Sequence, residues 1–187
     1  LEHNAQKMTA VANELTNRFA DTLNLQFGGI DYSLAPFPEV ERSLGTALER
    51  LGIAAVGYHG SLAAAAFVTD TVDQAKFART GFSGLMLPVL EDATLAARAK
   101  QDILSVKDML LYSAVCGTGL DTVPLPGDTT IEQLQSVLLD LAALSLRLDK
   151  PLTARLMPIP GKAAGITTCL TVSERVAPRA KAPSLSA

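Results

Sequence analysis

The chain of 187 residues has no tryptophan, and aromatic side chains make up only 5% of it. Its two cysteines, Cys116 and Cys169, are too few for a disulfide framework and lack the CxxC spacing of zinc or redox sites. We therefore expect a protein of the reducing cytoplasm. Charged residues are also sparse, at 19%, whereas hydrophobic residues reach 48%. This composition excludes a disordered chain and predicts a folded core.

The charge balance and the hydropathy argue against nucleic acid and membranes as partners. Sixteen Lys and Arg against nineteen Asp and Glu give a formal charge of −3, without the basic surplus that phosphate neutralisation needs. The most apolar uninterrupted run, residues 62–68, is far shorter than the ~20 residues that span a bilayer, and no signal peptide is recognisable. The chain opens on Leu1 in an amphipathic segment, which favours a fragment or a processed product.

Apolar residues recur at three- and four-residue spacing in six segments, which predicts helices over 4–21, 39–51, 61–76, 91–100, 105–115 and 129–148. In the first helix the predicted buried stripe is Met8, Val11, Leu15 and Phe19. For the last helix, Asp128 and a capping box of Thr129 and Glu132 predict the start. The side chains predicted to face inward there are Ile131, Leu134, Leu138, Leu141 and Leu148.

Short apolar runs between these helices predict five strands, at 27–34, 53–57, 84–89, 120–125 and 152–159. Strands regularly separated by helices need right-handed crossovers, so we expect a single α/β domain over 1–165 with a mostly parallel sheet. Residues 166–187 lose the periodicity and are rich in Ala, Pro, Lys, Arg and Ser. We expect a poorly ordered tail there.

In an open parallel sheet, ligands bind beyond the carboxyl ends of the strands, next to helix N-termini. His59 follows the strand at 53–57, Glu91 follows the strand at 84–89, and Asp31 lies late in the first strand. His59 lies in Gly-Tyr-His-Gly, where an imidazole can act as acid, base or metal ligand. The alternative is a loop histidine that bonds to the backbone.

Cys116 precedes the turn Gly117-Thr-Gly119, whose backbone N–H groups could make its thiolate nucleophilic. The alternative is a buried, inert cysteine. Asp121 lies inside an apolar strand and must therefore have a partner. Glu91 and Asp92 are either oxygen ligands of a divalent cation or acidic residues favoured by a helix dipole. The chain has no GxGxxG or GxxxxGK[ST] phosphate-binding loop, so these motifs do not predict a nucleotide, and the sequence leaves the cofactor and the metal unknown.

Four segments, in this order, resemble the family catalogued as domain of unknown function 711, also called UPF0210. They are Phe27-Gly-Gly-Ile-Asp-Tyr-Ser-Leu-Ala-Pro, Val56-Gly-Tyr-His-Gly, Leu87-Pro-Val-Leu-Glu-Asp and Ala114-Val-Cys-Gly-Thr-Gly-Leu-Asp-Thr-Val-Pro-Leu-Pro-Gly-Asp-Thr. The resemblance runs from about residue 27 to about residue 165. It places the motif positions of the family at Asp31, His59, Glu91, Cys116 and Asp121.

The resemblance implies a mostly parallel five-stranded half-barrel, similar to half of the barrel of pyruvate-formate-lyase-like glycyl radical enzymes. It also implies a longer architecture of which this chain is the C-terminal part, so an N-terminal half is missing. Radical chemistry is not implied, because Arg175-Val176-Ala177-Pro178 has no glycine at the required place. A half-barrel exposes apolar surface, so we expect it to pair with the missing half or with a second copy as a homo-oligomer.

The sequence is compatible with two functions of different classes. The first is an enzyme acting on a small molecule, with Cys116 as nucleophile and His59 as acid or base, and with Asp31, Glu91 and Asp121 as ligand-binding groups. The second is a non-catalytic assembly or ligand-binding module. A metal-dependent hydrolase using Asp31, His59 and Glu91 is a weaker third, because no compact ligand motif is present.

Overall fold

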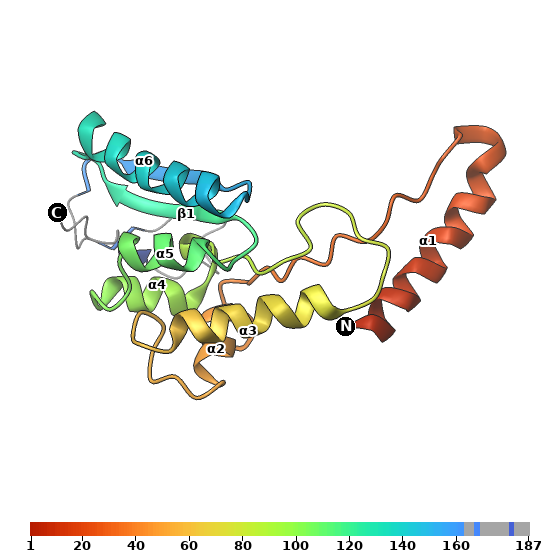
Figure 1. Cartoon of the computed structure of the whole chain (residues 1–187), viewed down its shortest axis with the longest axis horizontal. Coiled ribbons are helices and arrows are strands. Elements are labelled where there is room, and N and C mark those ends of the chain that lie inside the picture. Colours follow the sequence, from red (N-terminus) through yellow and green to blue (C-terminus); the bar gives the residue numbers. More distant parts are fainter. Residues whose placement is uncertain (163–166, 169–179, 182–187) are drawn as a thin grey trace.

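The computed structural model describes residues 1–162, 167–168 and 180–181. It is a mixed α/β structure around a small parallel sheet of two strands, β1 (Gly119–Pro126) and β2 (Thr153–Ile159). The helix α6 (Ile131–Leu148) joins them, as a parallel pair requires. Figure 1 shows α6 lying along one side of β1, with α5 (Val106–Ser113) on the other side. The predicted crossover between the last two strands is therefore confirmed.

The remaining elements are mostly helices and lie close to where the periodicity predicts them. In chain order they are α1 (Glu2–Leu23), the 3-10 turn η1 (Val40–Arg42), α2 (Leu44–Glu49), α3 (Ser61–Gln74), the 3-10 turn η2 (Val89–Glu91), α4 (Ala93–Lys100), β3 (Thr167–Thr168) and β4 (Ala180–Lys181). The helix predicted over 39–51 is shorter than expected and is divided into η1 and α2. The predicted poor order of 166–187 falls almost wholly outside the described residues, apart from the antiparallel pair of β3 and β4.

Three of the five predicted strands do not form ladders among the described residues. The segments 27–34, 53–57 and 84–89 are held only by isolated parallel bridges, Ile30 to Arg79, Leu34 to Leu85 and Val56 to Tyr58. Backbone in the left-handed region at Gly29, Gly57 and Ser83 interrupts regular pairing there. The expected five-stranded half-barrel is thus not present in the part of the chain that the structure describes.

The core lies between the two-stranded sheet and helices α3, α4 and α5. Every residue of β1 is buried, and Leu120, Val123 and Leu125 are fully buried. The largest side chains that join them are Leu48, Leu85, Leu87, Leu95, Leu104 and Met109. Each such burial stabilises the fold by roughly 1.5–3 kcal/mol before the entropic cost of ordering. The sheet is small, but its strand β1 is buried as completely as a strand in the interior of a domain.

The start of α6 lies one residue later than predicted. Thr130, not Thr129, is the N-cap; its hydroxyl accepts from the N–H of Gln133, and the Gln133 side chain accepts from the N–H of Thr130. Asp128 is exposed and does not cap the helix. A Thr-Thr pair followed by Glu-Gln offers two capping registers, so the sequence pattern alone does not decide between them.

Helix α1 exposes the apolar side chains that the sequence predicts to be buried. Helix α1 contacts the rest of the chain mainly at its start, where Glu2 Oε1 accepts from the N–H of Lys76 at 2.8 Å, and Figure 1 shows its remainder standing apart from the body. The stripe predicted to be buried on α1 is exposed, at 50% for Met8, 58% for Val11, 50% for Leu15 and 41% for Phe19. No helix in the described part of the chain combines the length and apolarity needed to cross a bilayer.

Helix α6 faces the core with a different stripe from the predicted one. Val137 and Leu141 are buried, and Leu134 and Leu144 pack partly against the core. Three side chains predicted to face inward are exposed instead: Ile131, Leu138 and Leu148. The predicted inward face is therefore correct for Leu134 and Leu141 only. The error has a physical cause, because α6 is apolar on two sides and periodicity does not say which one meets the sheet.

Candidate functional site

A β-bulge in β1 creates the one charged contact in the centre of the sheet. Leu120 pairs with Ala154 and Val123 with Leu156, so two residues of β1 oppose Arg155 alone. The second of them, Thr122, has φ of +40°, which bends the strand locally. The first, Asp121, is turned toward Arg155: Nε of Arg155 donates to Oδ1 of the carboxylate, and Nη2 forms an ion pair with the same oxygen. The partner that an aspartate in an apolar strand requires is therefore Arg155.

Glu91 joins this pair from the end of η2. Its Oε1 lies 4.0 Å from Nη2 of Arg155, and both side chains are about half exposed. Asp121 is only 1% exposed, and its Oδ2 is buried without a hydrogen-bond partner among the described residues. A buried carboxylate oxygen without a donor is costly, so it can accept a hydrogen bond from water or from a ligand group. The structure thus brings together two of the five predicted site residues, Glu91 and Asp121.

Asp31 lies in a separate polar turn. Its Oδ1 accepts from the Ser33 hydroxyl at 2.5 Å and from the N–H of Ser83 at 3.0 Å. The hydrogen bond from Ser33, followed by that from Ser83, holds the pKa of Asp31 below its ordinary value. Gly81 has φ of +60°, and a Cβ there would lie 2.2 Å from Asp31 Oδ2, so glycine at this position lets the carboxylate keep its place in the turn. An open cleft between α1 and this turn is lined by Asn4, Lys7, Met8, Asp31, Tyr32 and Ser33.

His59 lies on the loop that enters α3. The residue after it, Gly60, is the N-cap of α3 and has φ of +98°. The imidazole is exposed and makes no hydrogen bond to any described residue. A histidine in this position is accessible to a ligand, but no group among the described residues orients the ring for proton transfer.

Cys116 is buried just before β1, at 1% exposure. The N–H of Gly119 donates to its Sγ at 3.3 Å, which is the backbone contact that the Gly117-Thr-Gly119 turn predicts. The ammonium of Lys150 donates to the carbonyl oxygens of Ser113, Ala114 and Cys116, and so neutralises the carboxyl end of α5. The thiol faces the turn and the core rather than solvent.

The printed contacts of the described residues do not join all five predicted site residues. The N–H of Gly117 donates to the carbonyl of Leu85, which sets Cys116 at the amino end of β1, whereas Glu91 and Asp121 lie further along. No hydrogen bond or ion pair of the described residues joins Asp31, His59 or Cys116 to Arg155. Residues 1–162, with the two short strands that follow, also contain no group of three or more His, Cys, Asp or Glu side chains able to hold a metal ion.

Asp92 has a structural role, as the cap of a helix. It is fully buried and is the N-cap of α4, where its Oδ1 accepts from the N–H groups of Thr94 and Leu95, both at 2.9 Å. Its Oδ2 accepts from the N–H groups of Leu44 and Gly45 at the start of α2. Five donors, including the Ser43 hydroxyl, saturate the carboxylate, so the helix-dipole alternative describes Asp92 better than a cation site.

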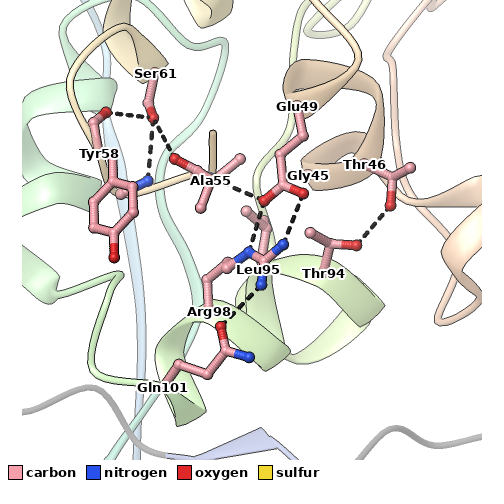
Figure 2. Close-up of polar contacts among 12 residues, drawn as sticks. Gly45, Thr46, Glu49, Ala55, Tyr58, Ser61, Thr94, Leu95, Arg98 and Gln101 are labelled. Carbon is pink, nitrogen blue, oxygen red and sulfur yellow. Dashed lines mark hydrogen bonds and ion pairs between the residues drawn. The ribbon is translucent and has the colours of Figure 1, made fainter. Parts of the chain in front are cut away.

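Two charged residues that the sequence analysis did not single out form a two-point ion pair between neighbouring helices. Arg98 donates from Nε to Glu49 Oε1 at 2.7 Å and from Nη2 to Oε2 at 2.8 Å, and Figure 2 shows the two groups facing each other between α2 and α4. Glu49 also accepts from the N–H of Val56. Neither Glu49, Arg98 nor Arg155 lies in a motif, and only their spacing across packed elements reveals them.

The family model described as "Uncharacterised ACR (DUF711)" matches residues 1–170 of the chain. The chain belongs to the DUF711 family. Among its relatives, a UPF0210 protein from Pyrobaculum arsenaticum is 38% identical over 165 residues, 86% of this chain and 37% of the relative. A UPF0210 protein from Syntrophobacter fumaroxidans is 39% identical over 163 residues, 85% of this chain and 36% of the relative. One from Methanopyrus kandleri is 37% identical over 169 residues, 88% of this chain and 37% of the relative.

The chain therefore spans little more than a third of the length of these DUF711 relatives. The family is described as uncharacterised, and the names of these relatives assign no activity. The predicted family membership is confirmed.

Proposed function

We propose that this chain is an assembly module, which associates with a second copy of itself through apolar helix faces. The observation that carries the proposal is the exposure of large aliphatic side chains on α1 and α6. On α6 the exposed fraction reaches 71% at Ile131, 70% at Leu139 and 84% at Leu146. Exposed apolar patches of this kind mark interaction surfaces in soluble proteins, because water opposes their exposure.

The half-barrel expected from the family resemblance is a more detailed version of this proposal, in which association completes the barrel. Among the described residues, the segments 27–34, 53–57 and 84–89 have parallel bridges but no ladder partner. Such edges are completed by pairing with another chain or segment. In the proposal, association orders these segments as strands of a larger barrel, similar to that of the glycyl radical enzymes, in a cytoplasmic homo-oligomer. Amide hydrogen exchange of 27–34 that slows with protein concentration would support this form of the proposal.

Sedimentation velocity over a wide concentration range tests the assembly proposal. We expect reversible association, which Leu15→Glu weakens because it puts a charge into the apolar stripe of α1. The matched control is Asn13→Glu, a charge added at an exposed position on the opposite side of the same helix. A chain that stays monomeric and unaggregated at every concentration would overturn the proposal.

A second candidate function is binding or turnover of a small molecule, favoured by the unpartnered Oδ2 of Asp121 next to Arg155. In this proposal Glu91, Asp121 and Asp31 bind the ligand, His59 is acid or base, and Cys116 is the nucleophile. Burial of Cys116 requires local opening before a thiolate could attack a substrate.

Alkylation of the thiol tests this second candidate. Iodoacetamide is added to the folded Cys169→Ser variant, and modification of Cys116 is followed by mass spectrometry. A nucleophilic Cys116 reacts faster than a free thiol of pKa about 8.5, and His59→Ala lowers that rate. A thiol that reacts only when the chain is unfolded removes the nucleophile from the proposal.

A further inference from the structure

Buried side-chain oxygen atoms without a hydrogen-bond partner are concentrated around the bulge of β1. Among the described residues, such atoms occur at Thr69, Thr118, Asp121 and Thr122, and the last three residues lie in β1 or directly before it. A buried polar atom without a partner is costly, so folded proteins keep few of them and usually pair them with water or a ligand. Their concentration within a single turn and strand indicates a binding site at the bulge.

The backbone of the bulge is also strained. Five described residues other than glycine have a positive φ, and Thr122 is the only one of them with a branched Cβ. A β-branched residue in the left-handed region is an outlier that persists only where the surrounding structure imposes it, and such residues are frequent at ligand-binding sites. Here the strained Thr122 stands beside Asp121, and both oppose Arg155. The strain therefore maintains the geometry that turns the carboxylate toward the guanidinium.

The charges at the bulge lack one positive group. Asp121 and Glu91 each have a carboxylate, whereas Arg155 is the one cation that contacts them among the described residues. Arg155 occupies Oδ1 of Asp121, Oδ2 has no donor, and Oε1 of Glu91 lies 4.0 Å from Nη2, beyond hydrogen-bond distance. A primary ammonium supplies three N–H donors and one positive charge, which is what the two carboxylates lack.

Two other ligand classes fit the bulge less well. A divalent cation prefers several oxygen ligands, but the Asp121 carboxylate already faces a guanidinium, and the described residues supply no third acidic or imidazole side chain. A simple anion is repelled by the carboxylates of Asp121 and Glu91 and leaves Oδ2 without a donor. The ligand therefore has to carry a cationic donor.

Arg155 can hold the other end of such a ligand. It reaches the bulge from β2, whose first three residues are exposed, whereas every residue of β1 is buried. The Arg155 side chain is 52% exposed, and its Nη1 donates to no described residue. A guanidinium with an unused N–H group is a common partner of a carboxylate. The half-exposed side chains of Arg155 and Glu91 form the open side of the site, and their movement gives a ligand access to Oδ2.

We propose that the bulge of β1 binds a small amino carboxylate, such as an α-amino acid. Oδ2 of Asp121 and the carboxylate of Glu91 accept hydrogen bonds from its ammonium, and Nη1 of Arg155 donates to its carboxylate. The strained bulge holds Asp121 in place before the ligand arrives, which lowers the entropic cost of binding. The inference rests on the ligand-binding form of the second candidate function and names the ligand class. It does not depend on Cys116 as a nucleophile.

A titration with L-alanine, followed by two-dimensional NMR of the amide signals, tests the ligand class. Alanine carries both charged groups and adds only a methyl group, so we expect a Kd of about 1 mM, with shifts of the amide signals of Asp121, Thr122 and Arg155. Propionate lacks the ammonium and ethylamine lacks the carboxylate. Each should bind at least about tenfold more weakly than alanine, because one end of the site then stays unpaired.

Substitutions at the exposed side of the site test the role of each residue. Glu91→Gln and Arg155→Lys should each raise the Kd for alanine about tenfold, and Arg155→Lys should also reduce the preference for alanine over ethylamine. Asp121→Asn should abolish binding, since an amide nitrogen or a neutral oxygen then replaces the charged acceptor. The matched control is Asp73→Asn, which removes a carboxylate from the exposed ion pair with Arg79 and leaves the Kd unchanged.

Three results would overturn the inference: alanine at about 20 mM moves no amide signal at the bulge, propionate or ethylamine binds as tightly as alanine, or Glu91→Gln and Arg155→Lys bind alanine like the unmodified chain. The alkylation of Cys116 distinguishes this failure from that of the second candidate function. A reactive Cys116 in a chain that does not bind alanine leaves that function standing. An inert Cys116 in a chain that does not bind alanine removes both.

Discussion

The buried carboxylate of Asp92 accepts a hydrogen bond from the hydroxyl of Ser43 at 2.6 Å, across 49 positions of sequence. Ser43 is itself the N-cap of α2 and accepts from the N–H of Thr46, while Asp92 is the N-cap of α4. One carboxylate therefore satisfies free N–H groups at the starts of two helices, which fixes the helices against each other. A short helix such as α2 has little stability of its own and depends on this contact.

We expect Asp92→Ala to lower the free energy of unfolding by about 3 kcal/mol, because it leaves the N-termini of both α2 and α4 without their acceptor in a buried site. Urea unfolding followed by circular dichroism measures the change. The matched control is Asp128→Ala, which removes an exposed carboxylate that caps no helix and should cost less than about 0.5 kcal/mol. Equal losses in the two variants would show that Asp92 is not the shared cap.

The stability of the chain should depend on the protonation of Glu49. The hydrogen bonds from Arg98 hold the pKa of Glu49 below its ordinary value of 4.5, so the folded state binds the proton less well than the unfolded state. The resulting stability is fully present above about pH 4.5 and is lost as the pH falls through the lowered pKa. We expect Glu49→Gln to make the free energy of unfolding less dependent on pH below 4.5, measured by urea titrations at several pH values.

Glu14→Gln provides the control for that measurement, because Glu14 is exposed on α1 and makes no ion pair with any described residue. It should leave the acid dependence close to that of the unmodified chain. If the free energy of unfolding of Glu49→Gln falls below pH 4.5 as steeply as that of the unmodified chain, the ion pair with Arg98 does not couple folding to pH.

The sequence predicts the helices and the last two strands well because their signals are local. Ser105, the N-cap of α5, and the apolar run at 120–125 can be recognised in the sequence without knowing which segments they contact in the fold. The segments 27–34 and 84–89 also carry apolar residues, yet they form no ladder with any residue that the structure describes, since a strand exists only where another backbone pairs with it. The contact of Asp121 with Arg155 depends on a bulge that shifts the register, and no periodicity reports such a shift.

Substitution of Gly52 and of Gly57 by alanine distinguishes the cost of backbone strain from the cost of a steric clash. Gly52 and Gly57 have similar left-handed φ, +103° and +110°, but a Cβ at Gly52 meets nothing within 4 Å, whereas one at Gly57 lies 2.2 Å from the carbonyl oxygen of Ile103. We expect Gly52→Ala to cost about 1 kcal/mol, the strain of a left-handed alanine. Gly57→Ala should cost more than about 3 kcal/mol, because the backbone at residue 103 must also move. Thermal unfolding of both variants measures the difference, and equal costs would place the loop further from residue 103.

Asp121 and Arg155 form an ion pair at the bulge of β1. Arg155→Met leaves the carboxylate of Asp121 buried without a cation, and we expect it to lower the free energy of unfolding by about 2–3 kcal/mol, less than for a wholly buried pair because Arg155 is half exposed. The double variant Asp121→Leu with Arg155→Met removes both charges and should recover most of that loss. Glu91→Gln, at the exposed edge of the cluster, should cost less than about 1 kcal/mol. Urea unfolding of the three variants decides the matter: a double variant no more stable than Arg155→Met would show that the pair contributes packing rather than charge compensation at the centre of the sheet.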